Sequence, residues 1–66
     1  MKNSLKIERA IKNLTQDELA KLIGVSRQTI NSIETGRYIP STVLALKISK
    51  VFEKPVNEIF ALEISD

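Results

Sequence analysis

A three-residue connection near the middle of the chain restricts its fold more than any other feature of the sequence. Gly24 can adopt the left-handed backbone conformation that ends a helix, and Ser26 is a good N-cap for the next one. Only Val25 separates the two. A connection this short predicts two helices that cross steeply, because it is too tight to join them as an antiparallel hairpin.

The segments on either side of this turn have the signals of short amphipathic helices. Thr15 and Glu18 have the three-residue offset of a capping box, which predicts that the first of these helices begins at about residue 16. Gly36 predicts the end of the second helix, and the small side chain of Ala20 suits a close crossing. The spacing therefore indicates a helix-turn-helix at about residues 16–35. The predicted buried positions are Leu19, Leu22 and Ile23 in its first helix and Ile30 and Ile33 in its second.

Three further helices are predicted from the rest of the chain. An apolar repeat predicts a helix at about residues 4–12. Ser41 is the expected cap of a fourth helix, and Pro55 stands at the start of a short fifth helix, where its missing N–H does no harm. The apolar positions are Leu5, Ile7 and Ile11 in the first of these helices and Val56, Ile59, Phe60 and Leu62 in the last.

The composition argues against an enzyme. The chain has 66 residues, with no cysteine and no histidine. These are the side chains that carry out most nucleophilic, general-base and zinc chemistry near neutral pH. No apolar run approaches the roughly 18 residues that span a bilayer, and no signal peptide is recognisable. We therefore expect a small cytoplasmic domain with no cofactor, no metal, no membrane contact and no evident small-molecule ligand.

Positive charge is concentrated in the first part of the chain. Residues 1–52 contain nine Lys or Arg against four Asp or Glu, whereas residues 53–66 contain one Lys against four Asp or Glu. This distribution is typical of a basic body that meets nucleic acid and an acidic end that faces elsewhere. A solvated surface with accidental asymmetry is the alternative.

The polar face of the helix after the turn carries side chains suited to reading DNA. With Ile30 and Ile33 turned inward, an arginine, two amides and two hydroxyls are left outward or near the helix start. Arg pairs bidentately with guanine and Gln or Asn with adenine in the major groove, and Thr offers a methyl group to thymine. The lysines and glutamates of the other solvated faces are missing here, although a plain solvated face is the alternative. The predicted base contacts are Arg27, Gln28, Thr29, Asn31 and Ser32.

The chain resembles the Cro/lambda-repressor (XRE) family of prokaryotic helix-turn-helix DNA-binding proteins. The resemblance lies in the stretches LTQDELAKLIGVSRQTINSIETGRYIPS and LALKISKVFEKPVNEIF, which together cover nearly the whole chain. It implies an all-α, five-helix lambda-repressor-like domain over residues 1–66. It also implies a homodimer that binds a palindromic operator on double-stranded DNA and regulates transcription, as a repressor.

The resemblance assigns roles to residues outside the recognition face as well. It implies that Gln16 binds a DNA phosphate and that the loop after the third helix lies along the DNA backbone. Tyr38 in that loop has an alternative, in which its ring packs over the loop and its hydroxyl stays in water. The implied phosphate contacts of the loop region are Thr35, Arg37 and Tyr38.

Arg9 and Glu34 match two positions that often form a structural ion pair in this family. The pair would fix the third helix against the first, so Arg9 is not assigned to DNA. Glu8 departs from the family pattern, because an apolar residue is frequent at its position, and Ile7 or Ile11 is expected to take its place in the packing.

Two further departures from the family pattern concern single turns. Asn13 stands where glycine is frequent, but Asn also tolerates the left-handed conformation. Pro55 stands where a Ser or Thr cap is common. Neither position belongs to the DNA-facing set.

The C-terminal segment contains more apolar surface than so short a segment can bury alone. Phe60 is expected to pack on the core and the remainder to meet a second chain. Compact family members pair this tail with their first residues, which implies a small β-ribbon with residues 1–3, whereas a frayed terminus is the alternative. An antitoxin or another protein-interaction module with the same fold remains the alternative function. The predicted dimerisation residues are Ile59, Leu62 and Ile64.

Overall fold

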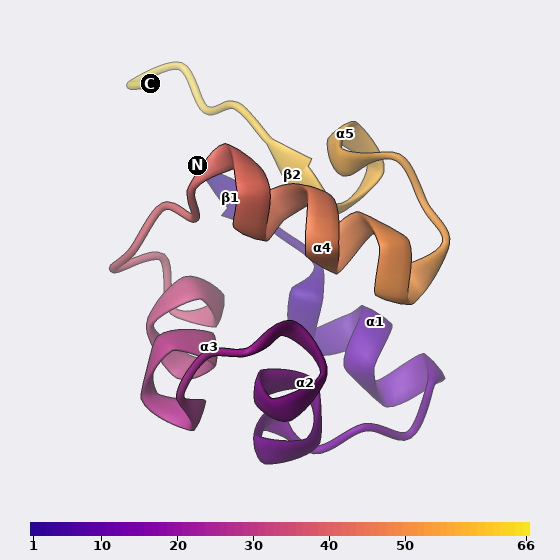
Figure 1. Cartoon of the computed structure of the whole chain (residues 1–66). Helices are drawn as coiled ribbons and strands as arrows, with labels where there is room; N and C mark the ends of the chain where they lie inside the picture. The colour runs from indigo at the N-terminus through magenta and orange to yellow at the C-terminus, as the bar shows by residue number, and fades with distance from the viewer.

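The computed structural model describes all 66 residues and contains five helices and one two-stranded antiparallel sheet (Figure 1). The fold confirms the predicted all-α class with its small terminal ribbon. No helix combines the length and the hydrophobicity that a membrane crossing requires. In chain order the elements are β1 (Lys2–Asn3), α1 (Leu5–Ile11), α2 (Gln16–Ile23), α3 (Arg27–Glu34), α4 (Thr42–Phe52), α5 (Val56–Ile59) and β2 (Phe60–Ala61).

Three helices begin at the caps that the sequence predicts. The Thr15 hydroxyl accepts a hydrogen bond from the Glu18 N–H over 3.0 Å, and the Glu18 carboxylate accepts one from the Thr15 N–H over 2.9 Å. These bonds complete the capping box of α2, and they lower the pKa of the Glu18 carboxyl below its ordinary value. Ser26 and Ser41 cap α3 and α4 through their hydroxyl oxygens. Gly24 ends α2 with a φ of 74°, in the left-handed region.

The terminal ribbon ends α5 earlier than the sequence predicts. Lys2 pairs with Ala61 in the antiparallel register. Asn3 pairs with Phe60, whose backbone is extended. The prediction that Phe60 and Leu62 continue the fifth helix is therefore wrong, because this segment pairs with β1 instead. Phe60 does pack on the core, as expected.

All five helices contribute to one hydrophobic core. The predicted inward positions of α2 and α3 are buried, with the exception of Leu22, which is 61% exposed. Ile59 is 2% exposed, so it has almost no surface left for the dimer contact that the sequence predicts. The core consists of Leu5, Leu19, Ala20, Ile23, Ile30, Ile33, Leu44, Ile48, Phe52, Ile59 and Phe60.

α1 buries a different face from the one that the sequence predicts. Ile7 and Ile11 are 62% and 68% exposed, so neither takes the place of Glu8 in the packing. Glu8 itself is buried, and its Oε2 accepts a hydrogen bond from Lys54 Nζ over 2.9 Å. The prediction is wrong because Lys54 supplies the counter-charge that lets a carboxylate occupy this position.

Two residues other than glycine have a left-handed backbone. Asn13, in the turn after α1, has a φ of 57°, which the sequence analysis allowed for. Glu53, at the C-terminal end of α4, has a φ of 54°. Asparagine can offset the strain of this conformation with a local hydrogen bond from its short side chain, whereas glutamate cannot. The end of α4 therefore lowers the stability of the fold.

Candidate nucleic-acid interface

The crossing of α2 and α3 buries one side of α3 and leaves the other side free (Figure 1). Ile30 and Ile33 are 0% and 1% exposed on the inner side, and Ala20 of α2 is buried as well. The Val25 N–H closes the turn by donating to the Ala20 carbonyl over 3.0 Å. The outer side of α3 is therefore held in a fixed orientation by a buried inner side.

Three of the predicted base contacts lie together on this outer side. Arg27, Gln28 and Asn31 are exposed. With Gln16 at the start of α2 they line one shallow depression that contains no apolar residue. A surface of one guanidinium and three amides can exchange hydrogen bonds with base edges and phosphates, and it has no apolar area that would favour a protein core.

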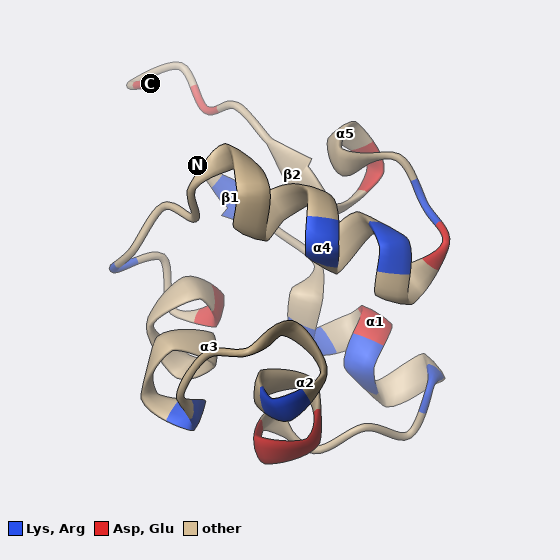
Figure 2. Cartoon of the chain, in the orientation of Figure 1, with Lys and Arg blue, Asp and Glu red and all other residues tan.

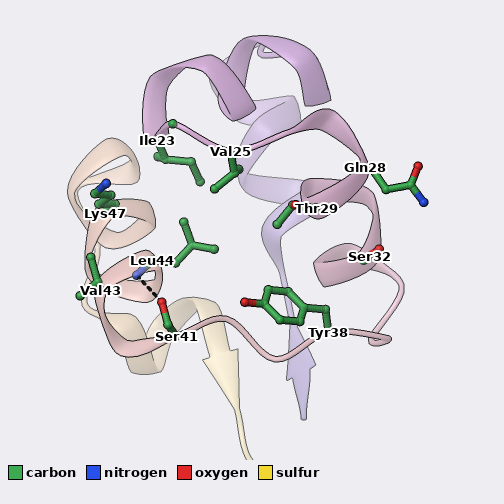
Figure 3. A pocket seen from close by; sticks show the side chains of 11 residues that line it. Ile23, Val25, Gln28, Thr29, Ser32, Tyr38, Ser41, Val43, Leu44 and Lys47 are labelled. Atoms are coloured by element: carbon green, nitrogen blue, oxygen red, sulfur yellow. Dashed lines mark hydrogen bonds between the residues drawn. The ribbon is translucent and has the colours of Figure 1, made fainter.

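A groove of about 540 Å³ separates α3 from α4 (Figure 3). Thr29 and Ser32, the other predicted base contacts, line its α3 side and are half-buried. Thr29 shares a hydrogen bond of 3.0 Å with the Ser26 hydroxyl. Gln28 points away from the groove, toward solvent (Figure 3). The polar rim also contains Tyr38, Ser41 and Lys47, and the apolar lining consists of Ile23, Val25, Val43 and Leu44.

The loop after α3 is anchored at its start. The Ser32 carbonyl accepts hydrogen bonds from the N–H groups of Arg37 over 2.9 Å and Tyr38 over 3.2 Å. Arg37 is exposed and has no acidic partner. The Tyr38 ring faces the groove (Figure 3), and the side chain is 45% exposed. Thr35 donates its hydroxyl hydrogen to the Asn31 carbonyl over 2.9 Å, so it has no hydrogen left for a phosphate oxygen.

The sequence predicts a DNA contact for neither Lys47 nor Ser41, yet both lie on the groove beside α3. Lys47 follows Val43 by four residues in α4, so both side chains lie on the same face of this helix, near its capped start. This four-residue spacing was the sequence signal that could have placed Lys47 on the groove. It was not sufficient, because only the packing of α4 on α2 brings this turn of α4 near α3.

Arg9 and Glu34 form an ion pair that joins α1 to α3. Arg9 Nε lies 2.6 Å from Glu34 Oε2, and Arg9 Nη2 lies 3.1 Å from Glu34 Oε1. The Arg9 and Glu34 side chains are 14% and 6% exposed. The hydrogen bond with Glu34 raises the pKa of the Arg9 guanidinium above its ordinary value. This pair is structural, and it leaves Arg9 little surface for a ligand.

Gln16 extends this contact to the outer side of α3. Its Nε2 donates to Glu34 Oε1 over 3.1 Å and to Asn31 Oδ1 over 3.3 Å. The amide that the family resemblance assigns to a phosphate therefore bonds within the protein, to a carboxylate and to a predicted base contact.

Cations without acidic partners surround α3, while acidic groups gather on the tail (Figure 2). Arg27, Arg37 and Lys47 have no carboxylate within ion-pair distance. Glu63 and Asp66 bind the Met1 ammonium at 2.9 and 3.0 Å. Positive charge without an acidic partner therefore lies beside the amides on the outer side of α3. No group of three or more Asp or Glu side chains gathers that could hold a metal ion.

Comparison with known proteins agrees with this geometry. Residues 5–59 match the helix-turn-helix family. An uncharacterised HTH-type transcriptional regulator of Methanocaldococcus jannaschii is 57% identical over 63 residues, which are 96% of each chain. YgzD of Bacillus subtilis, also an uncharacterised HTH-type transcriptional regulator, is 46% identical over 63 residues with the same coverage.

A solved structure is similar as well. The restriction-modification controller protein C.AhdI from Aeromonas hydrophila superposes with a TM-score of 0.77 and 32% sequence identity, over 85% of each chain. The sequence resemblance, the family match and the shared fold agree over the same elements. The chain belongs to the XRE-type helix-turn-helix family of DNA-binding transcriptional regulators.

Proposed function

We propose that this protein is a sequence-specific transcriptional repressor that binds a palindromic operator as a homodimer. One observation carries the proposal: Arg27, Gln28 and Asn31 are exposed together on a helix whose opposite side is fixed in the core. Repression then requires only that the operator is occupied, without a reaction and without a cofactor. A protein with this role acts at the chromosome, in the cytoplasm of a prokaryotic cell like those of its relatives.

Base recognition is assigned to the outer side of α3, inserted in the major groove. Arg27 suits guanine, and Gln28 and Asn31 present amides to base edges. Thr29 and Ser32 lie at the edge of this surface, beside the groove, and are the contacts of shorter reach.

Phosphate recognition is assigned to the two flanks of α3. Arg37 lies in the loop after α3 and Tyr38 lies on the groove toward α4, and we add Lys47 and Ser41 from the groove. The capped N-termini of α2 and α3 present backbone N–H groups and a positive dipole end to the other strand. Thr35 is left out, because its hydroxyl already donates to α3.

The homodimer is supported by the size of the domain and by its surface. One module of this size covers too little DNA for tight specific binding, and two modules on half-sites about 34 Å apart remedy this. Leu62 and Ile64 are exposed. Beside the ribbon lies a hollow of about 220 Å³ whose lining contains no charged side chain, and we call it the terminal apolar face. It is lined by Met1, Ile39, Pro40, Thr42, Ala45, Leu46, Val56 and Phe60.

Selection of bound fragments from random duplex DNA tests the proposal. We expect one enriched motif with two inverted half-sites whose centres are about 10 base pairs apart. A motif without inverted symmetry would contradict the homodimer on a palindrome. A protein that enriches no motif and co-purifies with a second protein would instead be an antitoxin or interaction module.

A further inference from the structure

We propose that Asn3 positions α3 relative to the terminal apolar face and so determines which spacing between half-sites the protein accepts. The inference rests on the proposed function, because it takes α3 to read a half-site and the terminal apolar face to meet a second copy. It follows from the place of Asn3 in the fold. Its backbone belongs to the terminal ribbon, while its side-chain amide bonds to α1 and to α3.

The Asn3 amide has a different backbone partner at each end. Its Nδ2 donates a hydrogen bond to the Ile33 carbonyl in the last turn of α3, over 2.9 Å. Its Oδ1 accepts one from the Leu5 N–H at the start of α1, over 3.1 Å. A carbonyl only accepts and an N–H only donates, so turning the amide over would break both bonds. The two partners therefore hold this side chain in one orientation.

The backbone of Asn3 lies in the ribbon that borders the terminal apolar face (Figure 1). Asn3 pairs with Phe60 across the ribbon, and Phe60 and Met1 both line that face. The next residue, Ser4, donates its N–H to the Ile59 carbonyl over 2.9 Å. The position of Asn3 is thus fixed relative to the surface that we assign to the second copy.

The bond from Asn3 is the one hydrogen bond that joins α3 to the ribbon. No hydrogen bond joins α3 to α4 or α5, and the groove of about 540 Å³ separates α3 from α4. Ile30 and Ile33 hold α3 on the core through apolar contacts, which have no preferred direction. The bond at the C-terminal end of α3 therefore sets the direction in which this helix points from the ribbon.

The placement of the two α3 helices in a dimer determines the operator that the dimer can hold. One additional base pair between the half-sites moves the second half-site by about 3.4 Å and turns it by about 35°. An α3 that is held rigidly cannot follow this change, so the dimer no longer binds both half-sites at once. We therefore expect the wild type to accept one spacing, and variants without the bond to accept neighbouring spacings as well.

The test measures affinity for the selected operator and for duplexes whose half-sites are one base pair closer together or further apart. The variant is Asn3→Asp, because its carboxylate still accepts from the Leu5 N–H but repels the Ile33 carbonyl. The wild type should bind the altered spacings about a hundredfold more weakly, and Asn3→Asp only about tenfold more weakly. Base preference within each half-site should not change. A mere loss of stability would weaken binding to every spacing alike.

Asn57→Asp is the matched control for the added negative charge. Asn57 is exposed on α5 and lines the same small hollow as Asn3, but the bonds to α1 and α3 come from Asn3 alone. Asn57→Asp should keep the wild-type preference for one spacing. If it accepts altered spacings as readily as Asn3→Asp does, charge is the cause and the inference is overturned. An Asn3→Asp variant with the wild-type penalty, or with changed base preference inside a half-site, overturns it too.

A second variant keeps the test decisive if Asn3→Asp does not fold. Asn3→Ser has a hydroxyl that can accept from the Leu5 N–H, as serine does in turns, but this side chain is uncharged and too short for the Ile33 carbonyl. It should accept altered spacings in the same way, and a folded Asn3→Ser with the wild-type penalty overturns the inference alone. A wild type that selects no inverted motif overturns the proposed function as well.

Discussion

Among the charged residues, Arg9 has a large expected effect on stability. Its partner Glu34 has a side chain that is 6% exposed, so removal of the guanidinium leaves a carboxylate charge with little water around it. We expect Arg9→Met to lower the free energy of unfolding by about 3 kcal/mol, measured by urea denaturation.

The double variant Arg9→Met with Glu34→Leu is the control for this prediction. It removes both charges, and it should recover most of the loss because no buried charge remains unpaired. If the double variant were no more stable than Arg9→Met, the loss would come from packing around the arginine stem and not from the orphaned carboxylate.

Lys47 provides a prediction about the groove beside α3. If each Lys47 of a dimer neutralises one phosphate, Lys47→Ala should reduce the slope of log affinity against log salt by about two and leave base preference unchanged. Lys50→Ala is the control, because Lys50 lies on the same helix but not on the groove. Equal reductions in both variants would mean that only the overall charge matters.

The residues of the candidate site could be predicted from the sequence where their positions depend on one helix alone. Ile30 and Ile33 determine which side of α3 is buried, and the outward positions of Arg27 and Asn31 follow from that. The place of Lys47 beside α3 could not be predicted, because it depends on the packing of α4 on α2. The orientation of the Asn31 amide depends likewise on a bond across 15 residues.

At the scale of helices, the starts of three helices could be predicted from local sequence, whereas the buried face of α1 could not. The caps Thr15, Ser26 and Ser41 act on N–H groups three residues away, so local sequence was enough to predict where α2, α3 and α4 begin. The buried face of α1 depends on a partner 46 residues away. Nothing near Glu8 in the sequence shows that Lys54 will neutralise it, so the sequence predicts a core position for Ile7, which is exposed.

The end of α4 offers a gain in stability. Glu53 has φ 54° and ψ 41°, a conformation that costs a side-chain residue about 1–2 kcal/mol and glycine almost nothing. Glycine also has more freedom to lose on folding, so we expect Glu53→Gly to raise the free energy of unfolding by about 0.5–1 kcal/mol in urea denaturation. Lys50→Gly, in the interior of α4, should lower it by about 1 kcal/mol. A loss of stability in Glu53→Gly would contradict the account.

At the scale of the whole molecule, the two ends of the chain are joined by charge as well as by the ribbon. Hydrogen bonds with Glu63 and Asp66 raise the pKa of the Met1 ammonium above its ordinary value of 8.0. The Glu63 N–H and the Met1 ammonium lower the pKa of the Asp66 carboxyl below 3.8. Because the pKa of the Met1 ammonium is raised in the folded state, its interactions stabilise the folded protein fully below pH 8. This stabilisation is lost as the pH rises through the pKa of the folded state.

The lowered pKa of Asp66 acts in the opposite sense, since its contribution is present above about pH 4 and is lost as pH falls through the folded value. We therefore expect the melting temperature to fall at both ends of this window. Acetylation of the Met1 amine should remove the alkaline fall and lower the melting temperature at pH 7, and Asp66→Asn should weaken the acidic fall. If the acetylated chain melts at the same temperature as the free amine at every pH, the interactions of the Met1 ammonium with Glu63 and Asp66 contribute nothing to stability.

In the proposed homodimer, we expect the terminal apolar face to hold the two domains together. Leu46 is 59% exposed on this face, and none of the residues that line the hollow has an acidic side chain, so a lysine there would place a charge in an interface that offers it no partner. We expect Leu46→Lys to raise the dimer dissociation constant at least tenfold in sedimentation equilibrium, and to bind full operators as weakly as single half-sites. Ile11→Lys is the control, since Ile11 is 68% exposed on α1, outside the face. If Ile11→Lys dissociates the dimer and Leu46→Lys does not, the second copy packs on α1, and the spacing between the two α3 helices changes with it.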